Sequence, residues 1–152
     1  MDYLRALIRE VIKEENSFTG AGIVVVKKDK GNLKFLGLHA KKGFDIPKGG
    51  VDPGESPIET AIRETFEEAS LSEPDLNFEW GKSSIKIDGR LVIFIASTSQ
   101  VPEIGINPKT GKKEHSGFSW LSFDDMTSNC KDFLKPAISW AHDVIQNESK
   151  RD

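Results

Sequence analysis

The sequence has few of the features that mark secreted, membrane-spanning or nucleic-acid-binding proteins. Its 152 residues include one cysteine, Cys130, so no disulfide can form within the chain, and a lone thiol is compatible with a reducing compartment. No apolar run approaches the roughly 18 residues of a membrane-spanning helix. The formal net charge of -3 leaves no overall positive field to attract nucleic acid. These absences predict a cytoplasmic protein that binds neither membrane nor DNA.

What is present is the composition of an ordinary globular domain. Hydrophobic residues make up 37% of the chain and charged residues 30%, which argues against a disordered or fibrous protein. A chain of this length can bury one substantial core. We therefore expect a single α/β domain over residues 1–152, built on a mixed sheet. The oligomeric state is left open.

The first and last segments are predicted to be helices. Residues 1–16 carry apolar side chains at helical spacing, typical of an amphipathic helix that packs on its own domain. A membrane-surface or partner-binding helix is the alternative interpretation. Residues 133–146 are predicted to form a C-terminal helix with Asp132 as its N-cap and Pro136 in its first turn.

Strands are expected in the middle of the chain. Two apolar runs flank a polar turn at Gly31 and are predicted to pair as strands. The segment from 83 to 97 is predicted to form a hairpin that turns at Asp88-Gly89. A last short strand is predicted at 117–123. The glycine- and proline-rich segment 44–55 is predicted to be an ordered loop.

The helix predicted at 56–69 has unusually clear start signals. Ser56 fits the N-cap, Pro57 fits the first helical position, and Glu59 completes a capping box.

Three glutamates lie on one face of this helix. Spacings of three and four place Glu64, Glu67 and Glu68 one turn apart, where like charges cost a few tenths of a kcal/mol per pair. A hard divalent cation bound between the carboxylates would replace their mutual repulsion with attraction. Magnesium, which takes oxygen ligands, suits such a site. The alternative is a plain solvated acidic face.

The residues around the glutamates form a pattern at fixed spacing. Gly49 is followed after five residues by Glu55, and after seven more by the run from Arg63 to Leu71. Residues 49–71 thus resemble the signature box of the Nudix hydrolases, without a gap. The box favours a bulky aliphatic residue where Thr65 stands and a glycine where Ser70 stands. We therefore expect Ser70 to adopt a left-handed helix-ending conformation.

The resemblance implies a fold, a reaction and a set of roles. The fold would be a Nudix-like α/β/α sandwich, and the reaction a metal-dependent hydrolysis of a diphosphate linkage in a nucleoside derivative, with magnesium or else manganese. The residues implied as metal ligands are Glu64, Glu67 and Glu68, with the carbonyl of Gly49 as a further one. Arg63 and Glu55 would form the ion pair that orients them. A carboxylate would accept or orient the proton of the attacking water.

Further candidates lie in the flanking loops. The stretch KKEHSGFSWL resembles the diadenosine tetraphosphate hydrolase branch of the family, which makes Glu114 a candidate base, with a helix glutamate such as Glu67 as the alternative. His115, the next residue, is a weaker candidate for a role in the site than Glu114. Lys48, in a Pro-Lys-Gly-Gly stretch, is predicted to face phosphate. Phe44 and Phe118 are candidates to stack on adenine, and core packing is an equal alternative for both.

The favoured function is hydrolysis of a dinucleoside polyphosphate such as diadenosine tetraphosphate. ADP-ribose and other nucleotide sugars, diphosphoinositol polyphosphates and the 5′ end of RNA remain alternatives, because the box determines the reaction and leaves the leaving group open. From another class, a catalytically silent domain could sense nucleotides. All three helix glutamates are present, which argues against that interpretation.

Overall fold

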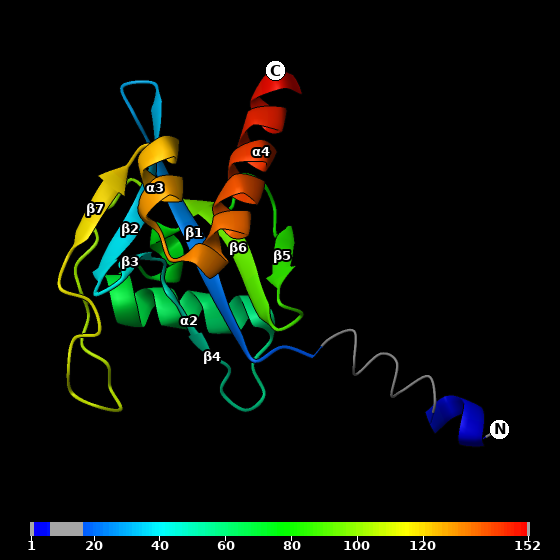
Figure 1. Ribbon diagram of the computed structural model, residues 1–152. Coiled ribbons are helices and arrows are strands. Elements are labelled where there is room, and N and C mark those ends of the chain that lie inside the picture. Colours follow the sequence, from blue (N-terminus) through cyan, green and yellow to red (C-terminus); the bar gives the residue numbers. More distant parts are fainter. Residues whose placement is uncertain (1, 7–16, 152) are drawn as a thin grey trace.

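A mixed sheet forms the middle layer of the molecule (Figure 1). The structure is a computed structural model, and it describes residues 2–6 and 17–151. Within these ranges the sheet has seven strands. They are β1 (Gly20–Asp29), β2 (Asn32–Ala40), β3 (Gly43–Asp45), β4 (Lys48–Gly50), β5 (Ser84–Ile87), β6 (Leu91–Ser97) and β7 (Phe118–Leu121). Strands β1 and β6 pair in parallel, and the other pairs are antiparallel.

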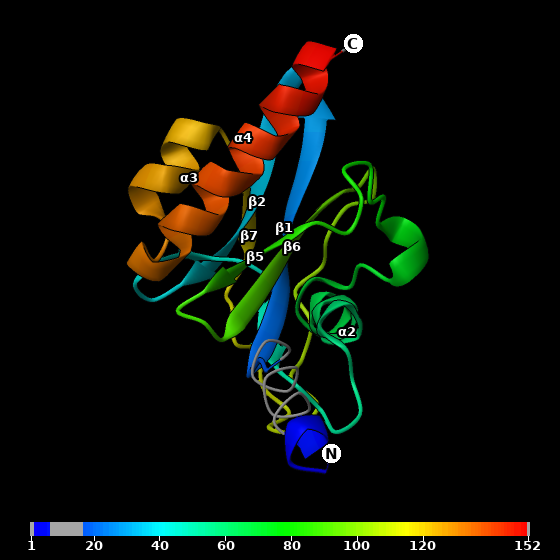
Figure 2. The same ribbon diagram turned by 90° about the vertical axis from the view of Figure 1, so that its right-hand side faces the viewer.

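Helices cover both faces of the sheet. Figure 2 shows α2 (Pro57–Ala69) on one side, and α3 (Phe123–Asn129) with α4 (Lys135–Arg151) on the other. Side chains alternate along β1, so Ile23 and Val25 pack toward α2 while Val24 and Val26 pack toward α3 and α4. Burial on both faces explains the unbroken apolar run of β1. The expected α/β/α sandwich is confirmed.

The predicted hairpins are confirmed, and one predicted loop is wrong. Strands β1 and β2 form the first hairpin, and β5 and β6 form the second. Asp88 and Gly89 have φ values of 53° and 69°, as their turn requires, although the loop extends by one residue to Arg90. The segment 44–55 is not all loop, because β4 pairs with β1 along Gly20–Gly22. A Cβ on Gly22 would collide with Pro47 and Lys48, so this pairing depends on glycine.

The C-terminal helix differs from the prediction in its limits. It runs over Lys135–Arg151 rather than 133–146, and a 3₁₀ turn, η2 (Asp132–Leu134), precedes it. Asp132 is inside that turn and is not its N-cap, a position that Lys131 takes. Pro136 lies in the first turn of α4, as predicted. A second short 3₁₀ turn, η1 (Glu73–Asp75), follows α2.

The predicted N-terminal helix is described only at its start. Residues 2–6 are helical, with Tyr3 80% and Leu4 57% exposed, so these two side chains are not part of the core. The rest of the prediction, 7–16, lies outside the described residues. None of the helices in the described ranges combines the length and apolar character of a membrane-spanning segment. Cys130 is a free, buried thiol.

Candidate active site

Helix α2 begins and ends as its sequence predicts. The hydroxyl of Ser56 accepts a hydrogen bond from the backbone N–H of Glu59 (3.4 Å), and the Glu59 carboxylate accepts one from the backbone N–H of Ser56 (3.0 Å). At the other end Ser70 has a φ of 57° and donates its N–H to the carbonyl of Phe66 (3.0 Å). These two caps determine which residues form the helix, and therefore where its glutamates point.

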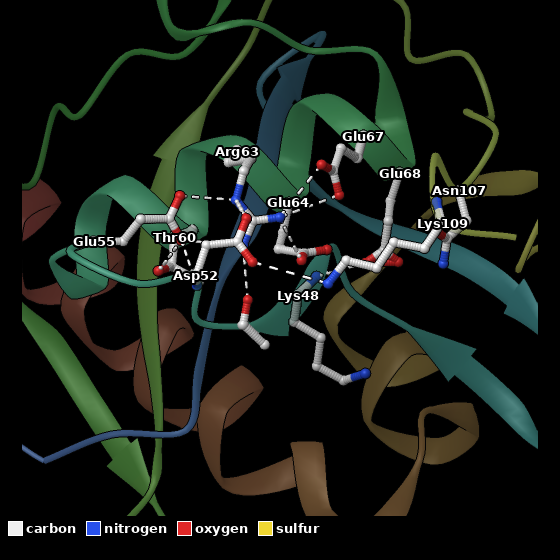
Figure 3. Close-up of polar contacts among 12 residues, drawn as sticks. Lys48, Asp52, Glu55, Thr60, Arg63, Glu64, Glu67, Glu68, Asn107 and Lys109 are labelled. Atoms are coloured by element: carbon white, nitrogen blue, oxygen red, sulfur yellow. Dashed lines mark hydrogen bonds and ion pairs between the residues drawn. The ribbon is translucent and has the colours of Figure 1, made fainter.

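Arg63 connects the loop, strand β4 and the glutamates of α2 (Figure 3). Its Nε and Nη2 donate to the two carboxylate oxygens of Glu55, at 2.8 and 3.1 Å. Nη1 donates to Glu64 (2.9 Å) and, at 3.3 Å, to Glu67, while Nη2 also donates to the carbonyl of Gly50 (2.7 Å). The planar guanidinium thus holds three carboxylates and one strand in fixed relative positions.

Glu55 is itself tightly held. Besides Arg63, it receives hydrogen bonds from the backbone N–H of Asp52 and the hydroxyl of Thr60, both at 2.9 Å. The hydrogen bonds from Arg63, followed by those from Asp52 and Thr60, lower the pKa of Glu55 to about 2. Glu55 is therefore a permanent anion that orients Arg63 at neutral pH.

Two of the helix glutamates are costly to ionise where they lie. Burial raises the pKa of Glu68 to about 8, although Glu68 accepts a hydrogen bond from the backbone N–H of Lys48 (2.9 Å). Burial also raises the pKa of Glu64. A cation between these carboxylates would offset that desolvation, so the oxygen donors fit a hard divalent ion.

The long loop between β6 and β7 is attached to the C-terminal part of α2. The N–H of Glu103 donates to the carbonyl of Ala69 (3.0 Å), and the N–H of Gly105 donates to that of Glu68 (3.1 Å). A Cβ on Gly105 would collide with the carbonyl of Glu67, so the loop approaches the helix this closely only at a glycine. The attachment brings Asn107 and the segment around Glu114 over the glutamate face.

The structure brings Glu114 to the helix glutamates. Ligand atoms of Glu68, Glu114 and His115 all lie within 4.8 Å of one another. The exposed carboxylate of Glu114 accepts a hydrogen bond from Nδ2 of Asn107 (2.6 Å). This position suits either a base or a metal ligand.

Asp45 is the site residue that sequence reasoning missed. It is buried, and its Oδ2 lies 3.1 Å from Nε2 of His115, whose Nδ1 lies 3.5 Å from the carboxylate of Glu68. It also pairs with Lys48 (3.0 Å) and Lys131 (3.3 Å). Burial raises the pKa of Asp45, but hydrogen bonds from His115 and Lys48 and the charge of Lys48 outweigh it, so the pKa falls below its usual value. An isolated aspartate in the sequence carries no signal of such a role.

The predicted substrate-binding residues are not gathered at one point. The side chain of Lys48 points away from the α2 glutamates in Figure 3, and its ammonium lies 5.6 Å from the ring centroid of Phe133. Phe44 contacts the His39 ring (5.4 Å between centroids) and packs with the core on the α3 and α4 side. Phe118 packs with the core on the α2 side. Because they lie on opposite faces of the sheet, Phe44 and Phe118 cannot stack on the same base.

A groove runs beside the glutamate face. Its lining combines the acidic residues of the site with lysines, and comprises Lys48, Gly49, Gly50, Arg63, Glu64, Glu67, Asn107, Pro108, Lys109 and Glu114. Carboxylates that can hold a cation, next to the exposed side chain of Lys109, are a combination suited to a phosphorylated substrate.

Comparison with known proteins identifies the family. The model of the NUDIX domain matches residues 17–144, which is most of the chain. The chain belongs to the Nudix family. It is a Nudix hydrolase of the pyrophosphohydrolase type, as the signature box implied.

The Nudix proteins that the chain resembles are named for different activities. The chain is 30% identical over 116 residues to a bis(5′-nucleosyl)-tetraphosphatase (asymmetrical) of Sus scrofa, covering 67% of this chain and 73% of that protein. It is 24% identical over 131 residues to an RNA pyrophosphohydrolase of Proteus mirabilis, covering 74% and 73%. The fold matches a crystal structure of a Caenorhabditis elegans Ap4A hydrolase binary complex with a TM-score of 0.69, 23% identity and coverage of 84% and 98%.

Proposed function

We propose that this Nudix hydrolase cleaves a phosphoanhydride bond in a dinucleoside polyphosphate, with diadenosine tetraphosphate as the leading substrate. The observation that carries the proposal is the convergence of Glu64, Glu67 and Glu68 with Glu114 beside a groove that also contains lysines. Proteins named for hydrolysis of bis(5′-nucleosyl) tetraphosphates are among its relatives, which supports this choice of substrate.

The glutamates of α2 would hold magnesium, with the carbonyl of Gly49 as a further oxygen donor. Glu64 and Glu68 are the residues whose pKa is raised by burial, and Glu67 is held beside them by Arg63. A magnesium ion held there would supply the positive charge that stabilises negative charge on the phosphate oxygens when water attacks phosphorus. Arg63 contributes geometry, because its Nη1 restricts Glu64 and Glu67, two carboxylates that line the groove.

Glu114 would accept a proton from the attacking water. Its carboxylate faces the helix glutamates, and Nδ2 of Asn107 holds one of its oxygens at 2.6 Å. Water adds through its oxygen to a phosphorus, the bridging P–O bond breaks, and one proton passes to the Glu114 carboxylate. For diadenosine tetraphosphate cut asymmetrically, the products are ATP and AMP.

The 5′ end of RNA is a second candidate substrate. RNA pyrophosphohydrolases are among the relatives, and the same groove would accept a terminal triphosphate. The net charge of -3 disfavours a long nucleic acid, because the overall field repels its backbone.

A substrate panel with magnesium tests the proposal. The panel holds diadenosine tetraphosphate, ADP-ribose, a nucleoside triphosphate, FAD, a diphosphoinositol polyphosphate and a 5′-triphosphorylated RNA, with products separated by chromatography. We expect the highest kcat/KM for diadenosine tetraphosphate, with ATP and AMP released. A higher kcat/KM for another compound would show that diadenosine tetraphosphate is not the preferred substrate. Absence of turnover with magnesium or manganese would favour a silent binding domain.

Two matched variants test the site within the same assay. Glu67→Gln removes a carboxylate from the groove, and we expect at least a 100-fold lower kcat/KM, about 2.7 kcal/mol at the transition state. Glu79→Gln makes the same chemical change at an exposed residue outside the groove and should behave as wild type. Full activity of Glu67→Gln would show that the site is assigned wrongly.

A further inference from the structure

Asp45 holds two lysine ammonium groups at once. Nζ of Lys48 lies 3.0 Å from its Oδ1, and Nζ of Lys131 lies 3.3 Å from its Oδ2. Asp45 has a side chain only 5% exposed, against 19% for Lys48 and 31% for Lys131. One buried carboxylate therefore positions two partly exposed cations and neutralises only one of them. Both lysine side chains remain partly accessible from the surface.

The positive charge continues along the surface next to Lys131. A depression there is lined by Ala40, Lys41, Lys42, Lys131, Asp132 and Phe133. Its acidic member, Asp132, already pairs with Lys135 (3.2 Å). Lys41 and Lys42 are exposed in the turn between β2 and β3. Three lysines thus share a depression in which the one carboxylate has another partner.

The chain holds this turn against the residues before η2. The N–H of Lys131 donates to the carbonyl of Phe44 (2.9 Å), and Phe44 forms a β-bridge with Cys130. A Cβ on Gly43 would collide with the carbonyl of Asn129, so the two segments touch through backbone at that point. The lysines of the turn and Lys131 are therefore held side by side by backbone contacts.

Lys48 links this depression to the catalytic groove. Its backbone N–H binds the carboxylate of Glu68, and the residue lines the groove together with Glu64 and Glu67. Its side chain leads away from the glutamates to the Asp45–Lys131 pair, over the ring of Phe133, which is 41% exposed. A polyanion with one phosphate at the glutamates would meet Lys48 and then Lys131 in this direction.

We propose that Lys48, Lys131, Lys41 and Lys42 form a distal phosphate subsite, which binds the part of the polyphosphate chain that extends beyond the metal-binding glutamates. The inference rests on the proposed function, because it assigns the groove a small polyphosphate ligand. The subsite selects substrates by the number of phosphates, since each further phosphate gains a lysine partner. ADP-ribose has two phosphates and therefore fewer to place on these lysines than a tetraphosphate has.

Kinetics on a series of substrates test the subsite. KM and kcat are measured with magnesium for diadenosine tri-, tetra- and pentaphosphate and for ADP-ribose. In Lys41→Met/Lys42→Met and in Lys131→Met, we expect KM to rise about tenfold for the tetraphosphate, with a larger rise for the pentaphosphate than for ADP-ribose. A rise in KM without an equal fall in kcat marks lost binding rather than lost chemistry. An equal loss for every substrate would overturn the proposal.

The control removes the same charge elsewhere. Lys28→Met/Lys30→Met alters two exposed lysines in the β1–β2 hairpin, at the end of β2 opposite to the β2–β3 turn. We expect this variant to keep wild-type KM values along the series. If it raises KM as much as Lys41→Met/Lys42→Met does, net charge explains the effect and the subsite is refuted.

Binding of inorganic tripolyphosphate separates this inference from the proposed function. Its affinity is measured by calorimetry without metal at low and moderate salt. Even if no dinucleoside polyphosphate is hydrolysed, we expect Lys41→Met/Lys42→Met to bind tripolyphosphate at least fivefold more weakly than the Lys28→Met/Lys30→Met control, with the difference smaller at higher salt. Equal affinities would refute the subsite. A 5′-triphosphorylated RNA that depends on these lysines more strongly than the tetraphosphate would refute the small-molecule ligand.

Discussion

The carboxylate of Glu64 occupies the space that a side chain on Gly49 would need. Gly49 lies in β4, which pairs with β1, and the Glu64 carboxylate also accepts a hydrogen bond from Nη1 of Arg63 (2.9 Å). The first glycine of the signature box and its glutamate helix are therefore in direct contact. Glycine is required at this position because strand and carboxylate approach each other closely, whatever its backbone angles.

Gly49→Ala should displace Glu64 without unfolding the protein. The Cβ would meet the flexible end of a side chain, so the carboxylate can move away at a small cost in stability. A misplacement of about 1 Å at a reacting site can cost about 100-fold in rate, and we expect a loss of that order in kcat/KM.

The neighbouring glycine supplies the control. A Cβ on Gly50 would have only the carbonyl oxygen of Thr19 nearby, at 3.9 Å, so Gly50→Ala should keep most of its activity. Thermal melts of both variants accompany the kinetics. Comparable activity in Gly49→Ala and Gly50→Ala would contradict the close packing of Gly49 on Glu64.

Arg63→Lys should impair the site although it keeps the positive charge. A lysine ammonium cannot reach Glu55, Glu64 and the carbonyl of Gly50 together, as the guanidinium does. We expect magnesium affinity to fall 10- to 100-fold, as for other residues that orient ligands, and the free energy of unfolding to fall by about 2 kcal/mol. Urea titrations and the magnesium dependence of the rate measure the two effects. If either stays at the wild-type value, Arg63 is not the link described above.

Acid should weaken the protein partly through Glu55. Its pKa is lowered from 4.5 to about 2 in the folded protein. A lowered pKa stabilises the folded state above pH 4.5, and that stabilisation is lost as the pH falls toward 2. Glu55→Gln should therefore be less stable than wild type at pH 7, with a smaller difference at pH 3. Urea midpoints at the two pH values give the comparison, and a constant difference would contradict the assignment.

Much of the candidate site followed from local sequence rules. The capping box at Ser56 and the left-handed end at Ser70 define α2, and once the helix is defined, spacing alone places Glu64, Glu67 and Glu68 on one face. These features depend on neighbours within a few positions of one another, so one sequence is enough to predict them.

What the sequence did not reveal depends on distant or weak signals. Asp45 meets His115 and Lys131, which lie 70 and 86 positions further along the chain. The opposite placement of Phe44 and Phe118 follows from the pairing of β2 with both β3 and β7, which local patterns do not predict. Helix α3 was missed because it has seven residues and buries only Met126, too few for a visible period.

Glu68→Gln should stabilise the metal-free protein at neutral to mildly alkaline pH. Burial raises the pKa of Glu68 from 4.5 to about 8, so the stability present below pH 4.5 is lost as the pH rises toward 8. A neutral amide avoids that loss. With a chelator present, we expect a higher melting temperature than wild type at pH 8 and a smaller difference at pH 5. Added magnesium should stabilise wild type more than it stabilises Glu68→Gln, which has lost one of the carboxylates proposed to hold the ion.

The exposed Glu79→Gln is the matched control for that experiment. It changes a carboxylate to an amide on the surface, so its melting temperature should follow that of wild type with and without magnesium. If Glu79→Gln raises the melting temperature as much as Glu68→Gln does, the change in net charge explains the stabilisation and the burial of Glu68 does not.

Glu114→Gln distinguishes a base from a metal ligand. Glu114 faces the helix glutamates within 4.8 Å of ligand atoms of Glu68 and His115, a position that serves either role. If Glu114 is the base, Glu114→Gln should lower kcat about 100-fold, while the magnesium concentration for half-maximal rate changes less than about twofold. Asn107→Ala, which releases the Glu114 carboxylate from a 2.6 Å hydrogen bond, should give a smaller loss in the same direction. A proportionate rise in the magnesium requirement would make Glu114 a ligand, and an unchanged kcat would transfer the role of base to a glutamate of α2.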